Sequence, residues 1–154
     1  MGGLSKDNII ELSAYGEMGF GGVSETQSIT QNNWTIVTNG DNNLWSTGAL
    51  QLKDITYSDD TLIIGKDGLY FLNCQLSLNG SSNSILRLGI YVNDVLACIC
   101  TGYQQLLNNR IVQLTYVDIL DLKENDVIKV VITNTANSNG VDAIAGKLAI
   151  NRIG

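Results

Sequence analysis

Side chains that could perform catalysis are scarce in this chain of 154 residues. It contains no histidine, so neither a serine–histidine nor a cysteine–histidine nucleophilic pair can form. Carboxylates occur close together at Asp59-Asp60 and at Asp118 and Asp121, but their spacing does not place two of them in a shared cleft. Asp59-Asp60 is instead typical of a solvated turn. We therefore expect a protein that is not an enzyme.

Oxygen ligands for a metal ion are present, but their spacing does not indicate a site. Asp41, Asp59, Asp60 and Asp94 carry the hard carboxylate oxygens that calcium prefers, without the spacing of an EF-hand loop. A zinc site is not indicated either, because the chain lacks both histidine and a Cys-x-x-Cys motif. We expect neither a bound metal nor a cofactor.

The 3 cysteines are best interpreted as small buried apolar residues. Cys98 and Cys100 lie two positions apart, which places them on the same face of a strand, where they do not form a natural disulfide. A disulfide between Cys74 and either of them would leave one cysteine unpaired. Cysteine chemistry therefore suggests no function.

Composition excludes two classes of partner. The formal net charge is −6 and no basic run occurs, which argues against binding to a nucleic-acid backbone. No apolar run reaches the roughly 18 residues of a membrane span, and the first residues lack the apolar segment of a signal peptide. Charged residues make up only 16% of the chain, so the surface must be rich in uncharged polar side chains. Such a surface suits a packed assembly or an extracellular particle.

The elements that position these residues are predicted to be strands from about residue 29 onward. Short runs rich in Val, Ile, Leu, Thr and Tyr alternate with breaks of Asn, Gly, Asp and Ser, and no helical periodicity is found. Asn93-Asp94 separates two apolar runs as a two-residue hairpin turn would. Many short strands at this spacing indicate an all-β sandwich or barrel. The predicted strands lie near 29–38, 49–57, 61–65, 68–79, 84–93, 95–103, 110–121, 126–134 and 143–152.

The first 28 residues follow a different pattern. Residues 16–22 contain four glycines. Glycine loses more conformational entropy on folding than other residues, so we expect this stretch to be unstable as an ordinary strand or helix. We therefore predict an extended N-terminal arm over residues 1–28 and a β domain over residues 29–154. The arm would dock on the domain, on a sister subunit or on a separate partner. Its expected anchors are the spaced large apolar residues Leu12, Tyr15, Met18 and Phe20.

The segment 68–78 alternates without interruption and is expected to have two different faces. One face suits the core of a sandwich and carries Tyr70, Leu72, Cys74, Leu76 and Leu78. The opposite face carries Leu69, Phe71, Asn73, Gln75 and Ser77, a mixture of apolar, amide and hydroxyl side chains without charge. This mixture resembles the composition of a subunit interface.

Several segments, in this order, resemble the tumour-necrosis-factor and complement-head superfamily. The family has an "L.I…GLY" pattern where this chain has Leu62 to Tyr70, and an "L.L..GD.I" turn where it has Leu120 to Ile128, with Asn125 at the usual glycine. The segments that carry the resemblance are Trp45–Gly48, Tyr57–Ile64, Asp67–Phe71, Leu120–Ile128 and Ala143–Ile150.

The resemblance implies a single jelly-roll sandwich of about ten strands that assembles as a compact homotrimer. It also implies which side chains lie along the threefold axis of that trimer. The positions after the "LY" pattern supply the first three, and neighbouring strands supply the others. The implied interface residues are Phe71, Asn73, Gln75, Thr115, Val117 and Ile144.

No collagen-like repeat, heptad or transmembrane stalk precedes the domain, which disfavours a vertebrate cytokine or complement protein. We therefore expect a non-enzymatic homotrimeric virion protein. We expect it to be a phage capsid decoration or head-fibre subunit, made in the host cytoplasm and displayed on the capsid exterior. Its arm would bind a capsid or other virion protein.

The alternative function is a receptor-binding or adhesin head, such as a fibre knob. Loops 39–48, 79–84 and 104–109 would then contact a host glycan or protein through their Asn, Ser and Gln side chains. Trp34 and Trp45 flank an Asn-rich loop and could stack on a sugar. Tryptophans at such positions more often belong to the core at the margin of a sheet.

Overall fold

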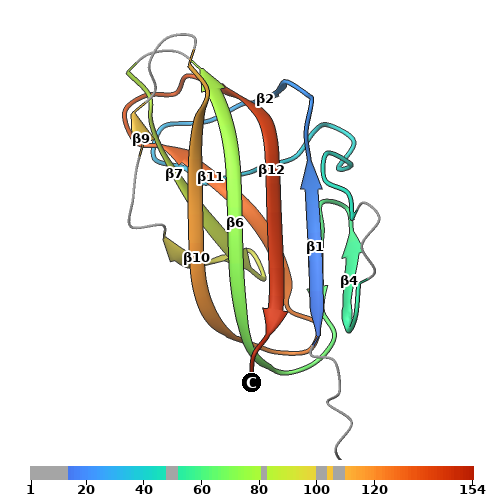
Figure 1. Ribbon diagram of the computed structural model, residues 1–154. Coiled ribbons are helices and arrows are strands. Elements are labelled where there is room, and N and C mark those ends of the chain that lie inside the picture. The colour runs from blue at the N-terminus through green and yellow to red at the C-terminus, as the bar shows by residue number, and fades with distance from the viewer. Residues whose placement is uncertain (1–13, 48–51, 81–82, 100–103, 106–109) are drawn as a thin grey trace, which may run out of the picture.

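The computed structural model describes residues 14–47, 52–80, 83–99, 104–105 and 110–154 (Figure 1). These residues form twelve strands, and none of them lies in a helix long and apolar enough to cross a membrane. The strands are β1 (Tyr15–Phe20), β2 (Glu25–Gln27), β3 (Thr35–Ile36), β4 (Ile55–Ser58), β5 (Thr61–Ile64), β6 (Gly68–Gly80), β7 (Ile85–Val92), β8 (Val95–Ile99), β9 (Gln104–Gln105), β10 (Val112–Leu122), β11 (Val127–Asn134) and β12 (Val141–Arg152).

The strands are arranged in two antiparallel sheets that pack face to face (Figure 1). Sheet A has the order β1-β12-β6-β10, with β2 also paired to β12, and it faces the viewer in Figure 1. Sheet B has the order β4-β5-β11-β7-β8, with β3 paired to β11 and β9 paired to β7. The predicted all-β sandwich is therefore confirmed.

The core lies between the two sheets and is built from alternate residues of each strand. On β6, the five residues predicted to face the core, from Tyr70 to Leu78, are each 0% exposed. Sheet B contributes residues such as Leu62, Leu88 and Ile128, which are also completely buried. Burial of each large apolar side chain contributes about 1.5–3 kcal/mol.

Asparagine and aspartate form the tight turns by adopting positive φ angles. The predicted hairpin at Asn93-Asp94 is confirmed, because β7 and β8 pair directly on either side of it. The two residues have φ angles of 52° and 63°, and a two-residue turn of this type requires positive φ at both positions. Asp59 and Asp60 form an equivalent turn between β4 and β5, with φ of 49° and 60°. Asn125, at the position where the family pattern has glycine, has a φ of 71°.

The structure corrects the expectation that the glycine-dense N-terminal stretch cannot form a strand. β1 pairs with β12 in a continuous register from Tyr15 opposite Asn151 to Phe20 opposite Gly146, and β2 pairs with the start of β12. Residues 15–20 and 25–27 of the predicted arm thus belong to sheet A, whereas residues 1–13 lie outside the described residues.

The glycines of β1 allow close packing against its neighbours. A Cβ atom on Gly16 would lie 2.7 Å from the side chain of Ile55, and one on Gly19 would lie 2.9 Å from the carbonyl oxygen of Gly146. Both distances are shorter than ordinary contacts. Gly16 and Gly19 are therefore explained by a lack of space beside β1 and not by an unstructured segment.

The predicted strand over residues 29–38 is much shorter than expected. Only β3 is a regular strand, because Asn32 adopts a φ of 64° and its amide donates to the carbonyl of Asn134. The predicted strand 95–103 is described only as far as Ile99, since residues 100–103 lie outside the described residues.

Candidate functional site

The side chains of sheet A that point away from the core form a continuous surface, which we call the outer face of sheet A. They alternate with the core residues along each strand, as the pleat of a sheet dictates. This face consists of Tyr15 and Glu17 on β1, Ala145, Lys147, Ala149 and Asn151 on β12, Leu69, Phe71, Asn73, Gln75 and Ser77 on β6, and Gln113, Thr115, Val117, Ile119 and Asp121 on β10.

Five of the six residues predicted to line the trimer axis lie on this face. The register of β6 with its two neighbours places them in rows across the sheet. Phe71 lies between Ile119 and Asn151, Asn73 between Val117 and Ala149, and Gln75 between Thr115 and Lys147. Their convergence on one surface comes from the strand pairing, and their role as an interface stays a prediction.

The sixth residue, Ile144, lies at an irregularity of β12. The pairing of β12 with β6 shifts between Ala143 and Ala145, so Ile144 is the extra residue of a β-bulge and has no direct partner on β6. Its side chain is partly buried. Ile144 is therefore not in the rows that hold the other five residues.

The middle of the outer face of sheet A is polar and contains an unsatisfied acceptor. Oδ1 of Asn73 is buried, yet it accepts no hydrogen bond from any described residue. It borders a cavity of about 180 Å³, which Gln75, Lys147 and Ala149 also line. Buried polar atoms in folded proteins nearly always have a partner, so this oxygen needs a donor that the described residues do not supply, either a water molecule or a group of another molecule.

The groups around Asn73 are held in place by side-chain interactions. Nε2 of Gln113 donates to Oε1 of Gln75 across 3.3 Å, which links β10 to β6. Nζ of Lys147 lies 2.9 Å from a carboxylate oxygen of Glu17, which links β12 to β1. This ion pair neutralises the two charges nearest the centre of the face.

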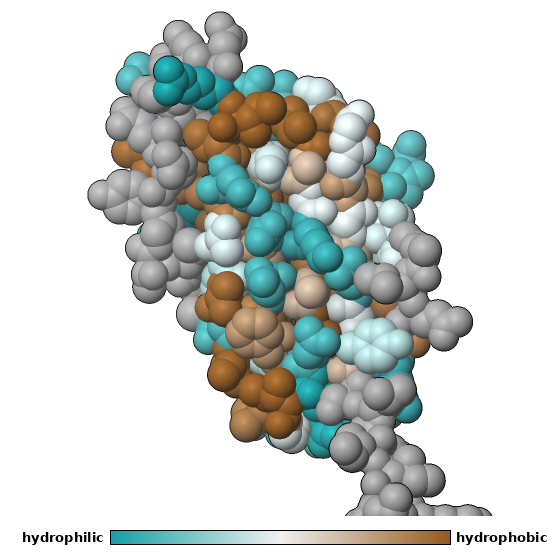
Figure 2. Space-filling model, viewed as in Figure 1, coloured by the Kyte–Doolittle hydropathy of each residue, from teal (hydrophilic) through white to brown (hydrophobic). Residues whose placement is uncertain are grey.

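One end of the face is apolar and exposed. Figure 2 shows a group of hydrophobic side chains at the lower end of sheet A, below a hydrophilic band. Leu69, Val117, Ile119 and Ile153 are each between 46% and 56% exposed. They are neighbours, because Ile119 pairs with Phe71 and the amide of Ile153 donates to the carbonyl of Leu69 across 2.8 Å. A contiguous exposed apolar patch marks an interaction surface more often than scattered residues do.

The predicted arm anchors serve mainly their own domain. Met18 is 0% exposed and belongs to the core, so of the three expected docking places it occupies the one on its own domain. Phe20 is partly buried and packs edge-on against Trp45, with ring centroids 4.7 Å apart. Tyr15 lies half-buried on the outer face of sheet A, and Leu12 lies outside the described residues.

The two tryptophans do not form a sugar-stacking pair. Trp45 is 1% exposed and its Nε1 donates to the carbonyl of Val37 across 2.7 Å, which confirms the core assignment. Trp34 is partly buried against Gly89, where a Cβ atom would approach its ring to 3.0 Å. Trp34 therefore covers the outer side of sheet B.

The paired carboxylates have structural roles. Asp59 is an exposed turn residue, as expected, but Asp60 is only 2% exposed and accepts hydrogen bonds from Thr38 Oγ1 at 2.6 Å and Trp45 N at 2.7 Å. Asp118 accepts from the Tyr116 hydroxyl at 2.8 Å, whereas Asp121 pairs with Lys123. Asp118 and Asp121 lie three positions apart on one strand, so they point to opposite faces.

No described group of three or more His, Cys, Asp or Glu side chains could hold a metal ion. Cys74 lies in the core, and burial raises the pKa of its thiol far above the ordinary value. Within the described residues, the outer face of sheet A is therefore the candidate functional site.

Sequence reasoning missed several members of the outer face, notably Ile119 and Ala149. The alternation that identified Leu69, Phe71 and Asn73 on β6 continues along β10, where it includes Ile119. Ala149 is small and gives no signal of its own. Its position follows only from the pairing of β12 with β6.

Comparisons with known proteins agree with this architecture. A model of the TNF (Tumour Necrosis Factor) family matches residues 43–143 of the chain. The chain belongs to the TNF family. Members of this family are typically homotrimeric and are cytokine-like ligands without enzymatic activity. No curated protein sequence matches the chain.

Solved structures of two other TNF-family proteins share the fold at low sequence identity. The structure of Eiger TNF from S. frugiperda is 15% identical, with a TM-score of 0.56, and the match covers 92% of this chain and 94% of that one. The structure of murine APRIL at pH 8.0 is 13% identical, with a TM-score of 0.53, and the match covers 90% of this chain and 99% of that one. At these identities the likeness shows the fold alone.

Proposed function

We propose that this protein is a non-enzymatic homotrimer whose subunits associate through the outer face of sheet A. The observation that carries the proposal is the buried, unsatisfied Oδ1 of Asn73 at the centre of this face, beside a contiguous exposed apolar patch. The typical homotrimeric state of TNF-family proteins supports it.

Association would satisfy both features of the face. The apolar end would be removed from water, which contributes about 25 cal/mol for each Å² buried. An amide or ammonium group of a neighbouring copy would donate to Asn73 Oδ1. A single polar group in an interface can also fix its register, because misaligned copies would leave that group buried without a partner. Asn73 would thus specify how the three subunits align.

The proposal predicts that Phe71→Asp dissociates the trimer. The substitution would bring three carboxylates together where little water remains, and a buried unpaired charge is strongly unfavourable. The matched control is Val95→Asp, since Val95 on β8 is 68% exposed and belongs to the other sheet. Sedimentation velocity should show a monomer for Phe71→Asp and a trimer for Val95→Asp. A trimer that survives Phe71→Asp would contradict the proposed interface.

We further propose that the trimer is a virion structural protein, a phage capsid decoration or head-fibre subunit displayed on the capsid exterior. The low content of charged residues, 16%, and the net charge of −6 support a role in a packed assembly. Because residues 15–20 and 25–27 are paired in sheet A, the capsid-binding arm of this proposal is limited to residues 1–13.

Removal of residues 1–13 tests the virion proposal. The truncated protein should keep the oligomeric mass and thermal stability of the full chain but lose binding to capsids in a co-sedimentation assay. Equal capsid binding by the two proteins would rule out an anchoring role for this segment. A truncated protein that loses its oligomeric mass would show instead that the segment is needed for assembly.

The second candidate function is a receptor-binding or adhesin head that recognises a host glycan or protein. The observation that favours it is a surface groove of about 390 Å³ beside the loop that begins at Asn39, one of the loops expected to contact a host. A glycan array distinguishes a head that binds a host glycan from a head that binds a host protein. Saturable glycan binding that is lost when Asn42 is replaced by alanine would support a lectin-like head, whereas no saturable binding would remove it.

A further inference from the structure

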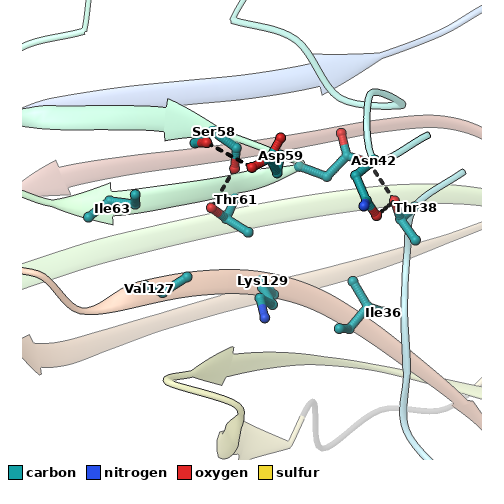
Figure 3. A pocket seen from close by; sticks show the side chains of 10 residues that line it. Ile36, Thr38, Asn42, Ser58, Asp59, Thr61, Ile63, Val127 and Lys129 are labelled. Atoms are coloured by element: carbon teal, nitrogen blue, oxygen red, sulfur yellow. Dashed lines mark hydrogen bonds between the residues drawn. The ribbon is translucent and has the colours of Figure 1, made fainter. Parts of the chain in front are cut away.

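The groove on the outer face of sheet B lies on the side of the sandwich opposite the outer face of sheet A. It opens where two short strands pair with the same edge of β11 and leave a gap between them. β5 pairs with β11 at Val127 and Ile128, and β3 pairs with it at Val131 and Ile132. Figure 3 shows the groove between this part of β11 and the segments that carry Thr38 and Asp59.

The groove combines an apolar floor with a polar rim. Its floor consists of Ile36, Ile63 and Val127, three aliphatic residues that are each partly buried. The rim includes the hydroxyl groups of Thr38 and Ser58 (Figure 3). No aromatic ring of a described residue lines the groove, so the described residues provide no stacking platform for a sugar there.

The charged residues at the groove differ in whether their charge is already compensated. Lys129 forms an ion pair with Asp94 at 2.6 Å, and the buried Asp60 is committed to hydrogen bonds with the loop over residues 38–45. Asp59 is exposed, forms no ion pair with any described residue, and accepts a hydrogen bond from the adjacent Ser58 hydroxyl at 3.1 Å. Its carboxylate is therefore the uncompensated negative charge at the rim.

We propose that this groove binds a basic side chain, arginine or lysine, that a partner protein presents. Such a side chain has an apolar stem and a cationic end, and it commonly buries the stem while the end remains at a polar boundary. The stem would lie on Ile36, Ile63 and Val127, and the cationic end would reach Asp59. A guanidinium group can donate two parallel hydrogen bonds to a carboxylate, so arginine fits better than lysine.

The charge of the whole chain favours the same kind of partner. A protein with a net charge of −6 attracts a basic partner over distances longer than any direct contact. The inference depends on neither the proposed trimer nor the virion role, since the groove belongs to a single protomer and to the other sheet. It would also be compatible with the virion role and with a head that recognises a host protein, but not with a head that binds a glycan in this groove.

In the test, the full chain is titrated with the capped peptide acetyl-Gly-Gly-Arg-Gly-Gly-amide. Binding is observed by NMR of the isoleucine and valine methyl groups of the protein. We expect saturable shifts of the Ile36, Ile63 and Val127 methyl signals that weaken as salt is added. The same peptide with citrulline in place of arginine keeps the shape without the charge and should not saturate these sites. Equal binding of the citrulline peptide would overturn the proposal.

Two substitutions with the same change in net charge locate the effect. Asp59→Asn should weaken arginine-peptide binding by about threefold to fivefold, the range of an exposed ion pair. Asparagine accepts the positive φ of this turn, so the fold should be kept. Asp41→Asn removes an exposed carboxylate that does not line the groove and should leave binding unchanged.

Three results would overturn the proposal. The first is equal weakening by Asp41→Asn and Asp59→Asn, which would indicate attraction by the overall charge. The second is an absence of methyl shifts at Ile36, Ile63 and Val127 at any accessible peptide concentration. The third is a disaccharide such as lactose that saturates these methyl shifts when the arginine peptide does not, which would assign the groove to a carbohydrate.

Discussion

At the scale of the residue, Asp60 has the clearest single role in the fold. Its carboxylate accepts hydrogen bonds from the Thr38 hydroxyl and from the backbone amides of Leu44 and Trp45. The Tyr57 hydroxyl lies 3.2 Å from the same group. One buried side chain thus joins the β4–β5 turn to the loop that carries Trp45 into the core.

Substitution of this residue tests its role. Asp60→Asn should lower the free energy of unfolding by about 2–3 kcal/mol, because hydrogen bonds to a charged group are lost and buried amides are left with poorer acceptors. The matched control is Asp59→Asn in the same turn, which should change it by less than about 0.5 kcal/mol. Urea denaturation at one protein concentration compares the two. Equal destabilisation by both variants would contradict the assignment.

The contrast between Asp59 and Asp60 shows a limit of sequence reasoning. The two residues are chemically identical neighbours, and the sequence predicted one solvated turn for both. Asp60 is buried because residues 38–45 fold over it. The residues next to Asp60 in the sequence carry no pattern that predicts a contact with this distant loop. The positive φ of both residues, in contrast, agrees with a known tolerance of aspartate.

The chemistry of Cys74 provides a second residue-scale prediction. Its side chain is 0% exposed, and burial raises the pKa of its thiol, so it should remain protonated and unreactive at pH 8. Iodoacetamide should modify Cys74 in the unfolded chain but not in the native protein, as peptide mapping by mass spectrometry would show. Native labelling of Cys74 at the unfolded rate would contradict its place in the core.

At the scale of the element, β6 and β1 show what a strand pattern can and cannot reveal. The alternation along β6 is strong, and each residue predicted to face the core is buried. In β1 the same alternation is present, with Met18 in the core, but glycine hides it at positions 16 and 19. Those glycines are explained by contacts with β4 and β12 that exist only in the folded sandwich.

If β1 is an integral strand, Met18→Ala should lower the free energy of unfolding by about 2–5 kcal/mol, as expected for truncation of a large buried side chain. Val23→Ala is a suitable control, because Val23 lies between β1 and β2 and is 40% exposed. Its effect should stay below about 0.5 kcal/mol. Thermal or urea unfolding measures both. A neutral Met18→Ala would mean that β1 is separable from the domain, as first predicted for an arm.

At the scale of the whole molecule, the two sheets offer different surfaces. The outer face of sheet A carries the apolar patch and the unsatisfied Asn73, whereas the outer face of sheet B carries the groove at Asp59. Because these surfaces lie on opposite sides of the sandwich, a trimer formed through sheet A would leave the groove open to a partner. Assembly and recognition would then be separate properties of one fold.

The sequence predicted the sandwich and the outward-facing residues of β6, because strand alternation is a local property, and the family resemblance added Thr115 and Val117. It could not predict which strands lie beside β6, and therefore missed Ile119 and Ala149 as neighbours of Phe71 and Asn73. The groove could not be predicted from the sequence for the same reason. Its walls come from β3, β5 and β11, which meet only through long-range pairing.

The mass of the native protein in solution tests the central claim most directly. Size-exclusion chromatography with multi-angle light scattering, at micromolar protein concentration, should give three times the 16.6 kDa mass of the protomer. That mass should not change on moderate dilution within the micromolar range. A mass equal to one protomer under these conditions would contradict assembly through the outer face of sheet A.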